Sequence, residues 1–478
     1  MDGPFVVIGG DAAGMSAASK SKRDDPDLDV LVFEKGEWVA YGACGLPYYV
    51  EGRIQSLDDL VSMTPEEFRE ERNIDLRTGH EVVGIDPEDR EVRVDPDAGE
   101  AFSQRYGTLL IATGAAATLP RIEGSDHEAV FTLGSLSDGH EIREYVSGLR
   151  SGAIEFEDPR GGEACAYFCE HAPRSVGIVG GGYIGIEMAE AFSAHDLEVH
   201  LFQRRDRLLR QFDEPVARVV EGHLAEQGVS VHVGAGVERI GETDEGVLAV
   251  ETGRESVPVD FVLVGAGVEP RAALAEEAGI DLGETGAIAT DAYGETSVEG
   301  IYAAGDCAEA TDVVTGEPTY APLALTANRH GRAIGRTVAG EPTLVGPIAG
   351  TAVLKAFDLE VARTGITDHG RADAAGFDPV TETVETASRS GYYPGGSTIT
   401  LSLTVDRESE SVLGASMVGE EGVAHRINTV VTALFSGMDL AELERLDLAY
   451  APPFSTVWDP ILVGAKVTRG RVEDTWPS

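Results

Sequence analysis

The chain has 478 residues, enough for about three domains with buried cores. Its 83 acidic residues outnumber 37 Lys and Arg, so the formal net charge is −46, yet 42% of the residues are hydrophobic. The apolar content excludes an acidic disordered chain, and the negative field makes nucleic acids and anionic membrane surfaces poor partners.

Cysteine usage and the N-terminal residues indicate the compartment. Four cysteines in a chain of this length exclude a disulfide-stabilised scaffold. The first residues lack the basic and apolar segments of a secretory signal, and no apolar run reaches the ~18 residues that span a bilayer. We therefore expect a cytoplasmic protein. Acidic residues are spread along the chain and arginine carries most of the positive charge, which favours a salt-rich, halophilic cytoplasm.

The first predicted element is a dinucleotide-binding unit at the N-terminus. An apolar strand at 5–8 is followed by a glycine-rich turn, a helix through Lys22 and a second apolar strand that ends at Glu34. Such a turn lets a pyrophosphate approach the backbone N–H groups at a helix N-terminus, and the terminal carboxylate accepts both hydroxyls of an unphosphorylated ribose. The turn departs from the usual pattern by placing Asp11 at the middle glycine. The predicted FAD contacts are Gly9, Gly10, Ala12, Ala13, Gly14, Glu34 and Lys35.

Cys44 is the candidate redox residue of this unit, within Tyr41-Gly-Ala-Cys44-Gly-Leu-Pro-Tyr-Tyr-Val-Glu-Gly52. A dithiol reductase needs a second cysteine nearby, but the positions five residues to either side hold Val39 and Tyr49. Cys44 therefore works alone. A lone thiol beside a flavin holds oxidising equivalents as a mixed disulfide with a small thiol, or as a sulfenic acid when the oxidant is oxygen or peroxide.

Two further strands complete the first unit. The buried strand at 109–111 ends in the small-residue turn Ala112, Thr113 and Gly114, which is typical of a crossing between two nucleotide domains. Residues 296–307 contain a strand that ends at Gly305 and Asp306, and this carboxylate is predicted to accept hydrogen bonds from the ribitol of FAD. Cys307 beside it is expected to be a small buried side chain.

A second dinucleotide-binding unit begins at residue 175 and repeats the same order of strand, turn, helix and strand. Gln203 ends its second strand without a carboxylate, and Arg204 and Arg205 follow directly. Guanidinium groups pair well with a 2′-phosphate, so we predict NADPH in preference to NADH; the alternative is that both arginines lie on a solvated face. The remaining predicted nucleotide contacts are Gly180, Gly182, Tyr183, Ile184, Gly185, Glu187 and Gly267.

The other segments define the domain organisation. Residues 151–173 lack periodicity and are expected to be an inserted surface loop; Cys165, Cys169 and His171 match no structural zinc spacing, so no metal is expected. After residue 340 the glycine patterns stop and alternating strands appear. We predict an α/β fold with two Rossmann-like domains, an FAD domain (1–116 and 290–340) and an NAD(P)H domain (117–289), plus a C-terminal α+β dimerisation domain (341–478).

Taken in order, the two glycine-rich units, Ala112-Thr-Gly114 and Ala303-Ala-Gly-Asp306 resemble the FAD-dependent pyridine nucleotide-disulfide oxidoreductases. The Cys44 segment resembles the single-cysteine group that contains coenzyme A-disulfide reductases and NADH oxidases. Gly391-Tyr392-Tyr393-Pro394-Gly395 and Ala449-Tyr450-Ala-Pro-Pro453 are similar to segments of coenzyme A-disulfide reductases. The resemblance implies a homodimer in which Tyr392 and Tyr450 of one subunit reach Cys44 of the other.

The resemblance also implies a substrate site. Ala40 and Ala43 occupy positions where coenzyme A-disulfide reductases often use Ser and Asn to contact the pantetheine arm. Lys20, Lys22 and Arg23 either bind the phosphates of coenzyme A or complement the C-terminus of their helix. No His-Pro pair occurs in the sequence, which leaves the tyrosines as proton donors, and Ala12 stands where peroxidases of the family carry histidine.

The leading hypothesis is an NAD(P)H-dependent flavoprotein that reduces a small disulfide, such as coenzyme A disulfide, through Cys44. One alternative is an oxidase, peroxidase or sulfur reductase that uses oxygen, peroxide or polysulfide through a Cys44 sulfenic acid or persulfide. A more distant alternative is a flavin-bound redox sensor without catalytic activity.

Overall fold

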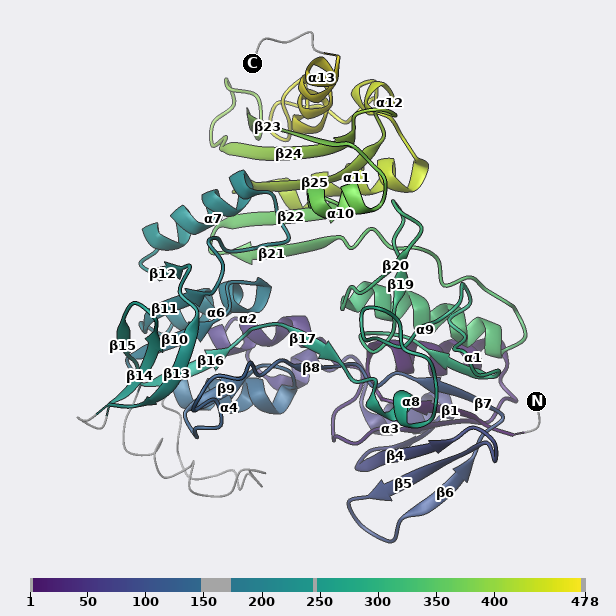
Figure 1. Cartoon of the computed structure of the whole chain (residues 1–478). Coiled ribbons are helices and arrows are strands. Elements are labelled where there is room, and N and C mark those ends of the chain that lie inside the picture. Colours follow the sequence, from purple (N-terminus) through teal and green to yellow (C-terminus); the bar gives the residue numbers. More distant parts are fainter. Residues whose placement is uncertain (1–2, 148–172, 244–246, 474–478) are drawn as a thin grey trace.

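The computed structural model describes residues 3–147, 173–243 and 247–473. The predicted insertion at 151–173, with Cys165, Cys169 and His171, lies outside the described residues except for its last position. Three five-stranded sheets organise the chain, each with its own helices, and the third stands at one end of the molecule (Figure 1).

The first sheet is parallel, with the strand order β18-β7-β1-β2-β3. Successive side chains along its strands point to opposite faces, and both faces are apolar. Phe5 and Val7 pack with helices α1 and α9, whereas Val6 and Ile8 pack with the meander β4-β5-β6. Both faces are therefore covered, as expected for a parallel sheet. The elements are β1 (Phe5–Ile8), α1 (Ala12–Asp24), β2 (Val30–Phe33), β3 (Asp75–Arg77), β4 (His80–Asp86), β5 (Glu91–Pro96), β6 (Phe102–Arg105), β7 (Thr108–Ile111), β18 (Ile301–Ala303) and α9 (Ala324–Val338).

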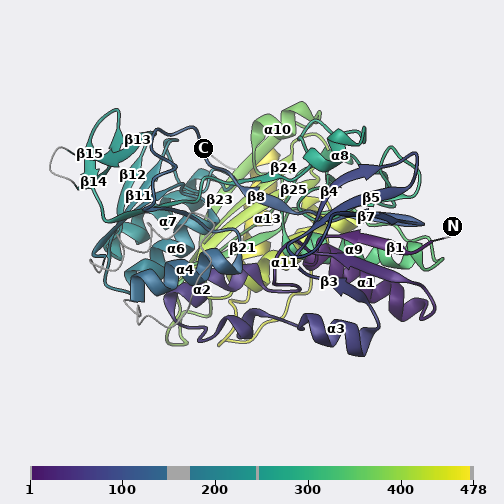
Figure 2. The same cartoon turned by 90° about the horizontal axis from the view of Figure 1, so that it is seen from below.

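The segment that carries Cys44 leaves this sheet after β2. It contains a 3-10 turn (Ala43–Gly45), α2 (Leu46–Glu51), a second 3-10 turn (Leu57–Leu60) and α3 (Pro65–Arg72). Helix α2 packs against α4 and α6 of the second nucleotide domain, so this segment spans the boundary between the two domains (Figure 2).

The second sheet repeats the design, with the order β12-β11-β10-β16-β9. An antiparallel ribbon of β8 (Ala115–Ala117) and β17 (Val268–Pro270) carries the chain from the first domain to the second and back. The elements are β9 (Val130–Thr132), α4 (Leu136–Ser147), β10 (Ser175–Val179), α6 (Tyr183–Ser193), β11 (Glu198–Gln203), α7 (Glu214–Glu226), β12 (Ser230–Val233), β13 (Val237–Glu242), β14 (Leu248–Thr252), β15 (Ser256–Pro258) and β16 (Phe261–Val264).

The chain returns to the first domain earlier than the expected residue 290. After β17, the side chains of Ala272, Ala275, Ile280 and Ile288 join the apolar core of the first sheet, and α8 (Ala273–Glu277) packs against β4. The glycine patterns indicated where the second unit ends. They did not indicate that the segment after β17 packs in the core of the first domain.

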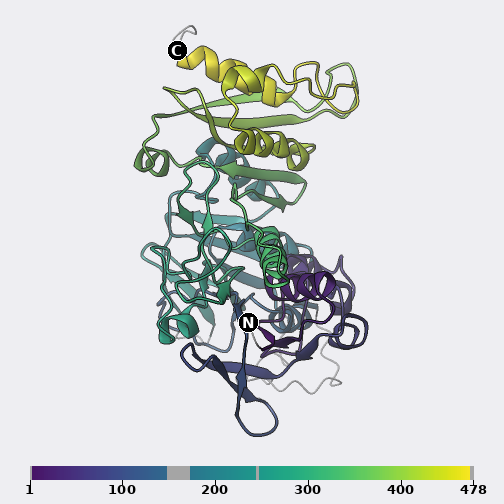
Figure 3. The same ribbon diagram turned by 90° about the vertical axis from the view of Figure 1, so that its right-hand side faces the viewer.

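The third sheet is antiparallel, with the order β21-β22-β25-β24-β23. Strands β24 and β25 are buried along nearly their whole length between α7, contributed by the second domain, and helices α11 and α13, which lie at the far end of the molecule (Figures 1 and 3). The elements are β19 (Ala310–Thr311), β20 (Pro318–Thr319), β21 (Ala352–Ala356), β22 (Leu359–Gly365), α10 (His369–Ala374), β23 (Pro379–Ala387), β24 (Thr398–Asp406), β25 (Val412–Gly419), α11 (Val423–Ser436), α12 (Leu440–Glu444) and α13 (Pro460–Val472).

These sheets confirm the predicted fold class of two Rossmann-like domains and a C-terminal α+β domain. Within the described ranges, no helix combines the length and the apolar character that crossing a bilayer requires.

Candidate active site

The first glycine turn brings three backbone segments into close contact. A Cβ on Gly9, whose φ is +108°, would lie 2.2 Å from the carbonyl oxygen of Ala112, and a Cβ on Gly14 would lie 1.9 Å from the carbonyl oxygen of Gly9. Side chains are therefore excluded where α1 meets β1 and β7. Glu34 accepts hydrogen bonds from the N–H groups of Gly10 (2.7 Å) and Gly36 (2.8 Å), which hold its carboxylate at the turn.

The second glycine turn has the same construction. Gly180 has φ +120°, and a Cβ there would lie 2.3 Å from the carbonyl oxygen of Gly265, while a Cβ on Gly185 would lie 1.9 Å from the carbonyl oxygen of Gly180. A Cβ on Gly182 would meet nothing within 4 Å. The open space at Gly182, at the start of α6, suits the close approach of a pyrophosphate.

The specificity segment follows β11 directly. Gln203 donates a hydrogen bond from Nε2 to the carbonyl oxygen of Arg207 (3.2 Å), and Arg204 and Arg205 are exposed. Their exposure fits both the predicted contact with a 2′-phosphate and the alternative that the two arginines lie on a solvated face. The same segment carries the exposed Asp206, which partly offsets their charge.

Two carboxyls meet beside the first turn. Gly305 adopts φ +84° against Ala13, so Asp306 follows at the start of α1. Burial raises the pKa of Asp306 to about 6. Burial, together with the charges of Glu34 and Asp306, raises the pKa of Asp11 to about 6 as well, and Asp11 accepts a hydrogen bond from the N–H of Tyr41 (3.2 Å). The sequence marked Asp11 only as a departure from the glycine pattern, and its bond to the Cys44 segment is a new finding.

Cys44 lies on the exposed 3-10 turn before α2. Its segment is fixed to the first turn by Ala40, which adopts φ +47° and donates from its N–H to the carbonyl oxygen of Gly10 (2.9 Å). Partial burial, followed by the negative charges of Glu187, Asp306 and Asp11, raises the pKa of the Cys44 thiol. Forming the thiolate therefore needs additional stabilisation from outside this set of residues.

Cys307 is the other cysteine among the described residues. It is fully buried, with its sulfur 3.5 Å from the carbonyl oxygen of Ile111, as expected for a small core side chain. Within the described part of the chain, Cys44 therefore has no partner for an internal disulfide.

Tyr48 connects the Cys44 helix to the second nucleotide turn. Its hydroxyl donates to Oε1 of Glu187 on α6 (3.2 Å). Burial raises the pKa of Glu187 to about 7, and burial together with the Glu187 charge raises the pKa of Tyr48. Sequence reasoning assigned Glu187 to nucleotide binding and missed Tyr48, although a polar residue four positions after Cys44 on one short helix was a usable signal.

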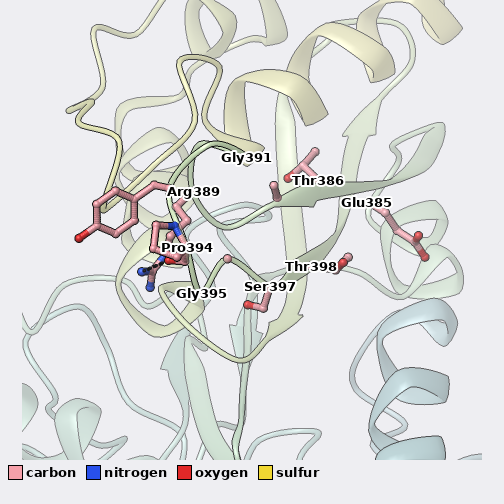
Figure 4. Close-up of a pocket in the computed structure, with 11 residues that line it drawn as sticks. Glu385, Thr386, Arg389, Gly391, Pro394, Gly395, Ser397 and Thr398 are labelled. Atoms are coloured by element: carbon pink, nitrogen blue, oxygen red, sulfur yellow. Dashed lines mark hydrogen bonds between the residues drawn. The ribbon is translucent and has the colours of Figure 1, made fainter.

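Tyr392 and Tyr450 lie together in the third domain. Their hydroxyl oxygens are 2.9 Å apart, and both side chains are exposed. Tyr392 lies on the loop between β23 and β24. Residues of the same loop and of the adjoining strand ends, among them Arg389, Gly391 and Pro394, line a hollow of 630 Å³ (Figure 4). Strands β23 and β24 form the side of the third sheet that is farther from α2 (Figure 1).

The predicted phosphate-binding cations lie at the end of α1. Lys20 is buried and pairs with Asp24 (2.5 Å), and Lys22 donates to the carbonyl oxygens of Pro26 and Leu28 (both 2.7 Å). Both lysines thus stabilise the turn after the helix, which favours the local alternative for them. Arg23 is exposed. Ala43 lies in the Cys44 turn, beside the thiol.

The comparisons with known proteins agree with this architecture. The family model described as pyridine nucleotide-disulphide oxidoreductase matches residues 3–331, and its dimerisation domain matches residues 351–460. The chain is 39% identical over 468 residues to the NAD(P)H coenzyme A polysulfide/persulfide reductase of Pyrococcus horikoshii, covering 97% of this chain and 98% of that protein. It is 27% identical over 465 residues to the coenzyme A disulfide reductase of Staphylococcus haemolyticus, covering 97% and 98%.

A solved structure of a related reductase has the same fold along nearly the whole chain. The NAD-dependent persulfide reductase from A. fulgidus superposes with a TM-score of 0.91 at 36% identity, over 99% of this chain and 84% of that one. Together with the two glycine turns, these similarities confirm the predicted pyridine nucleotide-disulfide oxidoreductase family and the predicted class of FAD-dependent disulfide oxidoreductase. The chain belongs to the pyridine nucleotide-disulphide oxidoreductase family, whose members depend on FAD and a pyridine nucleotide.

Proposed function

We propose that this protein is a homodimeric NADPH-dependent reductase that transfers electrons through FAD to Cys44 and from there to the sulfur of a small molecule. The observation that carries this proposal is the position of Cys44: it is exposed, its segment bonds to the first glycine turn through Ala40 and to Glu187 of α6 through Tyr48, and it has no partner cysteine in the described residues. Such a thiol can complete each turnover with a sulfur atom that comes from the substrate.

The residues around the first turn fit FAD. Gly9 and Gly14 let α1 begin close against β1 and β7, which suits a phosphate at the N–H groups of the helix start. Glu34 is held at the turn, where it can accept the hydroxyls of a ribose, and the Asp306 carboxyl, with its pKa raised by burial, suits the hydroxyls of ribitol. When bound, FAD accepts hydride from the nicotinamide and supplies two electrons to sulfur. Gly182 and the exposed Arg204 and Arg205 suit NADPH in the second domain.

Cys44 performs the sulfur chemistry. Its thiolate attacks a disulfide R–S–S–R, forms the mixed disulfide Cys44–S–S–R and releases RS⁻. Two electrons then break this bond and return the Cys44 thiolate and a second RS⁻. In all, one disulfide, one NADPH and one proton from solution yield two RSH and NADP⁺. Tyr392 and Tyr450 of the partner subunit are the proposed hydrogen-bond donors to the leaving sulfur.

The surroundings of Cys44 support a role for the partner subunit. Partial burial, and after it the acidic groups of Glu187, Asp306 and Asp11 in the same chain, raise the pKa of the thiol. Hydroxyl donors brought by a second copy of the chain would favour the thiolate. The exposed Tyr392 and Tyr450 form such a pair of donors.

Polysulfide or persulfide sulfur is a second candidate acceptor. It is favoured by the relatives with the higher identities, which are named for sulfur, polysulfide or persulfide reduction at 36–40%, whereas those named for coenzyme A disulfide are 27–29% identical. In this version the Cys44 thiolate attacks the terminal sulfur, the S–S bond next to that atom breaks, and the shortened sulfur chain leaves as an anion. Two electrons and one proton then cleave the resulting Cys44 persulfide into HS⁻ and the Cys44 thiolate.

The test is steady-state oxidation of NADPH and NADH in molar salt, with coenzyme A disulfide, other small disulfides, polysulfide and oxygen as separate acceptors. The proposal expects turnover with a disulfide or a sulfur chain that disappears in Cys44→Ser, and no such loss in Cys307→Ser. Oxygen as the only acceptor that supports turnover, or sulfur reduction that persists in Cys44→Ser, would contradict it.

A further inference from the structure

The two tyrosines of the third domain come from loops far apart in the sequence. Tyr392 lies between β23 and β24, and Tyr450 lies between α12 and α13. Their 2.9 Å hydroxyl contact is exposed, so no packing around the rings fixes it. A hydrogen bond between two exposed side chains on separate loops persists only if the loops themselves are held together.

One guanidinium binds the backbone of both loops. Arg426, on α11, donates from Nη2 to the carbonyl oxygen of Ser388 (3.0 Å) in the Tyr392 loop and to that of Phe454 (2.8 Å) in the Tyr450 loop. Its Nε donates to Oδ2 of Asp459 (2.8 Å). The side chains of Arg426 and Asp459 are only 13% and 10% exposed, which makes this a shielded charge pair whose hydrogen bonds are worth more than surface ones.

Neighbouring residues provide both the space and the counter-charge that the Arg426 guanidinium needs. Gly422, at the start of α11, adopts φ +76°, and a Cβ there would lie 2.1 Å from Nη1 of Arg426. Asp459 also accepts from the hydroxyl of Ser455 (3.1 Å) and caps α13 through the N–H of Ile461 (3.0 Å). The space and the counter-charge for the guanidinium are therefore both built into the fold.

Neighbouring contacts hold the same loop from the other side. Glu421 accepts from the hydroxyl of Ser388 (2.6 Å) and from Nε of Arg389 (2.7 Å), and Arg389 reaches the carbonyl oxygen of Pro394 beyond the tyrosine (Figure 4). Apart from the tyrosine contact itself, the direct bonds between the loops are longer: the N–H of Ser390 is 3.3 Å from the carbonyl oxygen of Pro452, and its hydroxyl is 3.3 Å from that of Ser455. Arg426 is thus the short, charged connection between the two tyrosine loops.

We propose that Arg426 is a positioning residue that sets the geometry of the Tyr392–Tyr450 pair and thereby the rate of sulfur chemistry at Cys44 of the partner subunit. This inference rests on the proposed function. The planar fork is required because it binds four acceptors at once, the Asp459 carboxylate and the carbonyl oxygens of Ser388, Gly422 and Phe454, which a lysine ammonium on a flexible stem does not reproduce. Arg426 therefore acts through the tyrosines and makes no contact with the reacting atoms.

The experiment separates two half-reactions in the FAD-loaded enzyme by stopped flow. Arg426→Lys is expected to leave flavin bleaching by NADPH at the parent rate and to slow reoxidation by the disulfide or sulfur acceptor at least tenfold. Arg407→Lys is the matched control, because Arg407 forms an exposed pair with Asp378 in the same domain, and it should change neither rate. Gly422→Ala displaces the guanidinium without removing it and should also slow reoxidation. It keeps the test available if Arg426→Lys does not fold.

A double-mutant cycle tells positioning from a general structural effect. In a Tyr392→Phe/Tyr450→Phe background, Arg426→Lys should have no further effect on reoxidation, because the groups it positions are gone. If reoxidation by Arg426→Lys and Gly422→Ala stays at the parent rate, or if the losses multiply fully in the cycle, the inference is wrong. If instead the double Phe variant itself reoxidises at the parent rate, the proposed role of the tyrosines fails, and that result is distinct from a failure of Arg426 alone.

Discussion

The Tyr48 hydroxyl donates a hydrogen bond to the Glu187 carboxylate across the boundary between the Cys44 helix and the second nucleotide domain. The contact joins two segments far apart in the sequence, the segment that carries Cys44 and the helix that follows the second glycine turn. Glu187 is largely buried, and burial raises its pKa to about 7. A group that titrates near neutrality therefore lies between the helix after Cys44 and the second nucleotide domain.

Replacing Glu187 by Gln should alter stability in a pH-dependent manner. The folded-state pKa of about 7 lies above the ordinary value of 4.5, so the carboxyl is protonated in both states at low pH, and stability is lost as the pH rises from about 4.5 to about 7. Glu187→Gln should thus be more stable, relative to the parent, at about pH 8 than at about pH 5. Melting curves at the two pH values measure this, with the exposed Glu277→Gln as control. A difference that is the same at both pH values would contradict the prediction.

Tyr48→Phe should become less stable relative to the parent as the pH rises, whereas Glu187→Gln should become more stable. The hydroxyl stabilises the buried carboxylate, so its loss costs about 1.5–3 kcal/mol once Glu187 is ionised and less when it is protonated. The melting temperature of Tyr48→Phe should therefore fall further below that of the parent as pH rises. Tyr49→Phe is the matched control on the same helix, because its hydroxyl bonds to His140 (2.9 Å) instead. An equal pH response in both variants would show that the Glu187 contact is not the cause.

NADPH should be preferred over NADH because Arg204 and Arg205 are exposed beside Gln203, which carries no repelling charge. Removing one charge-assisted contact should lower kcat/KM for NADPH roughly tenfold to a hundredfold. The check is steady-state kinetics with both nucleotides on Arg204→Ala/Arg205→Ala, with Arg210→Ala as an exposed control. An unchanged nucleotide preference in the double variant would mean that the specificity segment lies elsewhere.

Thermal stability should increase with salt. With a net charge of −46, self-repulsion extends over about 10 Å at 0.1 M salt but over only about 3 Å at 1 M. Melting temperatures at the two concentrations test this expectation of a salt-adapted protein. Equal melting temperatures would contradict it.

The parts of the site that sequence predicted are those in which backbone sterics dictate residue type. Gly9, Gly14, Gly180 and Gly185 leave no room for a Cβ, so the two turns were recognisable from spacing alone. The fold class followed, because two such units in one chain require two parallel sheets.

The parts that sequence missed depend on contacts between distant segments. Tyr48 and Arg426 are ordinary residues on their own helices, and only the packing of α2 on α6, and of two loops on α11, gives them partners. The same holds for Ile288, whose place in the first core moved the domain boundary. The raised pKa of Cys44 could not be predicted either, since Glu187 lies 143 residues away along the chain and acts through space.

The most direct test of the account is a single turnover of Cys44→Ser loaded with FAD. Because hydride transfer precedes the thiol step, NADPH should bleach the flavin at the parent rate, and the disulfide or sulfur acceptor should then fail to restore its colour. Parent enzyme should also carry a small thiol or sulfur on Cys44, seen as added mass that dithiothreitol removes and that is absent from the variant. Reoxidation of Cys44→Ser by these acceptors at the parent rate would contradict the central claim, and loss of oxygen reduction alone would favour an oxidase.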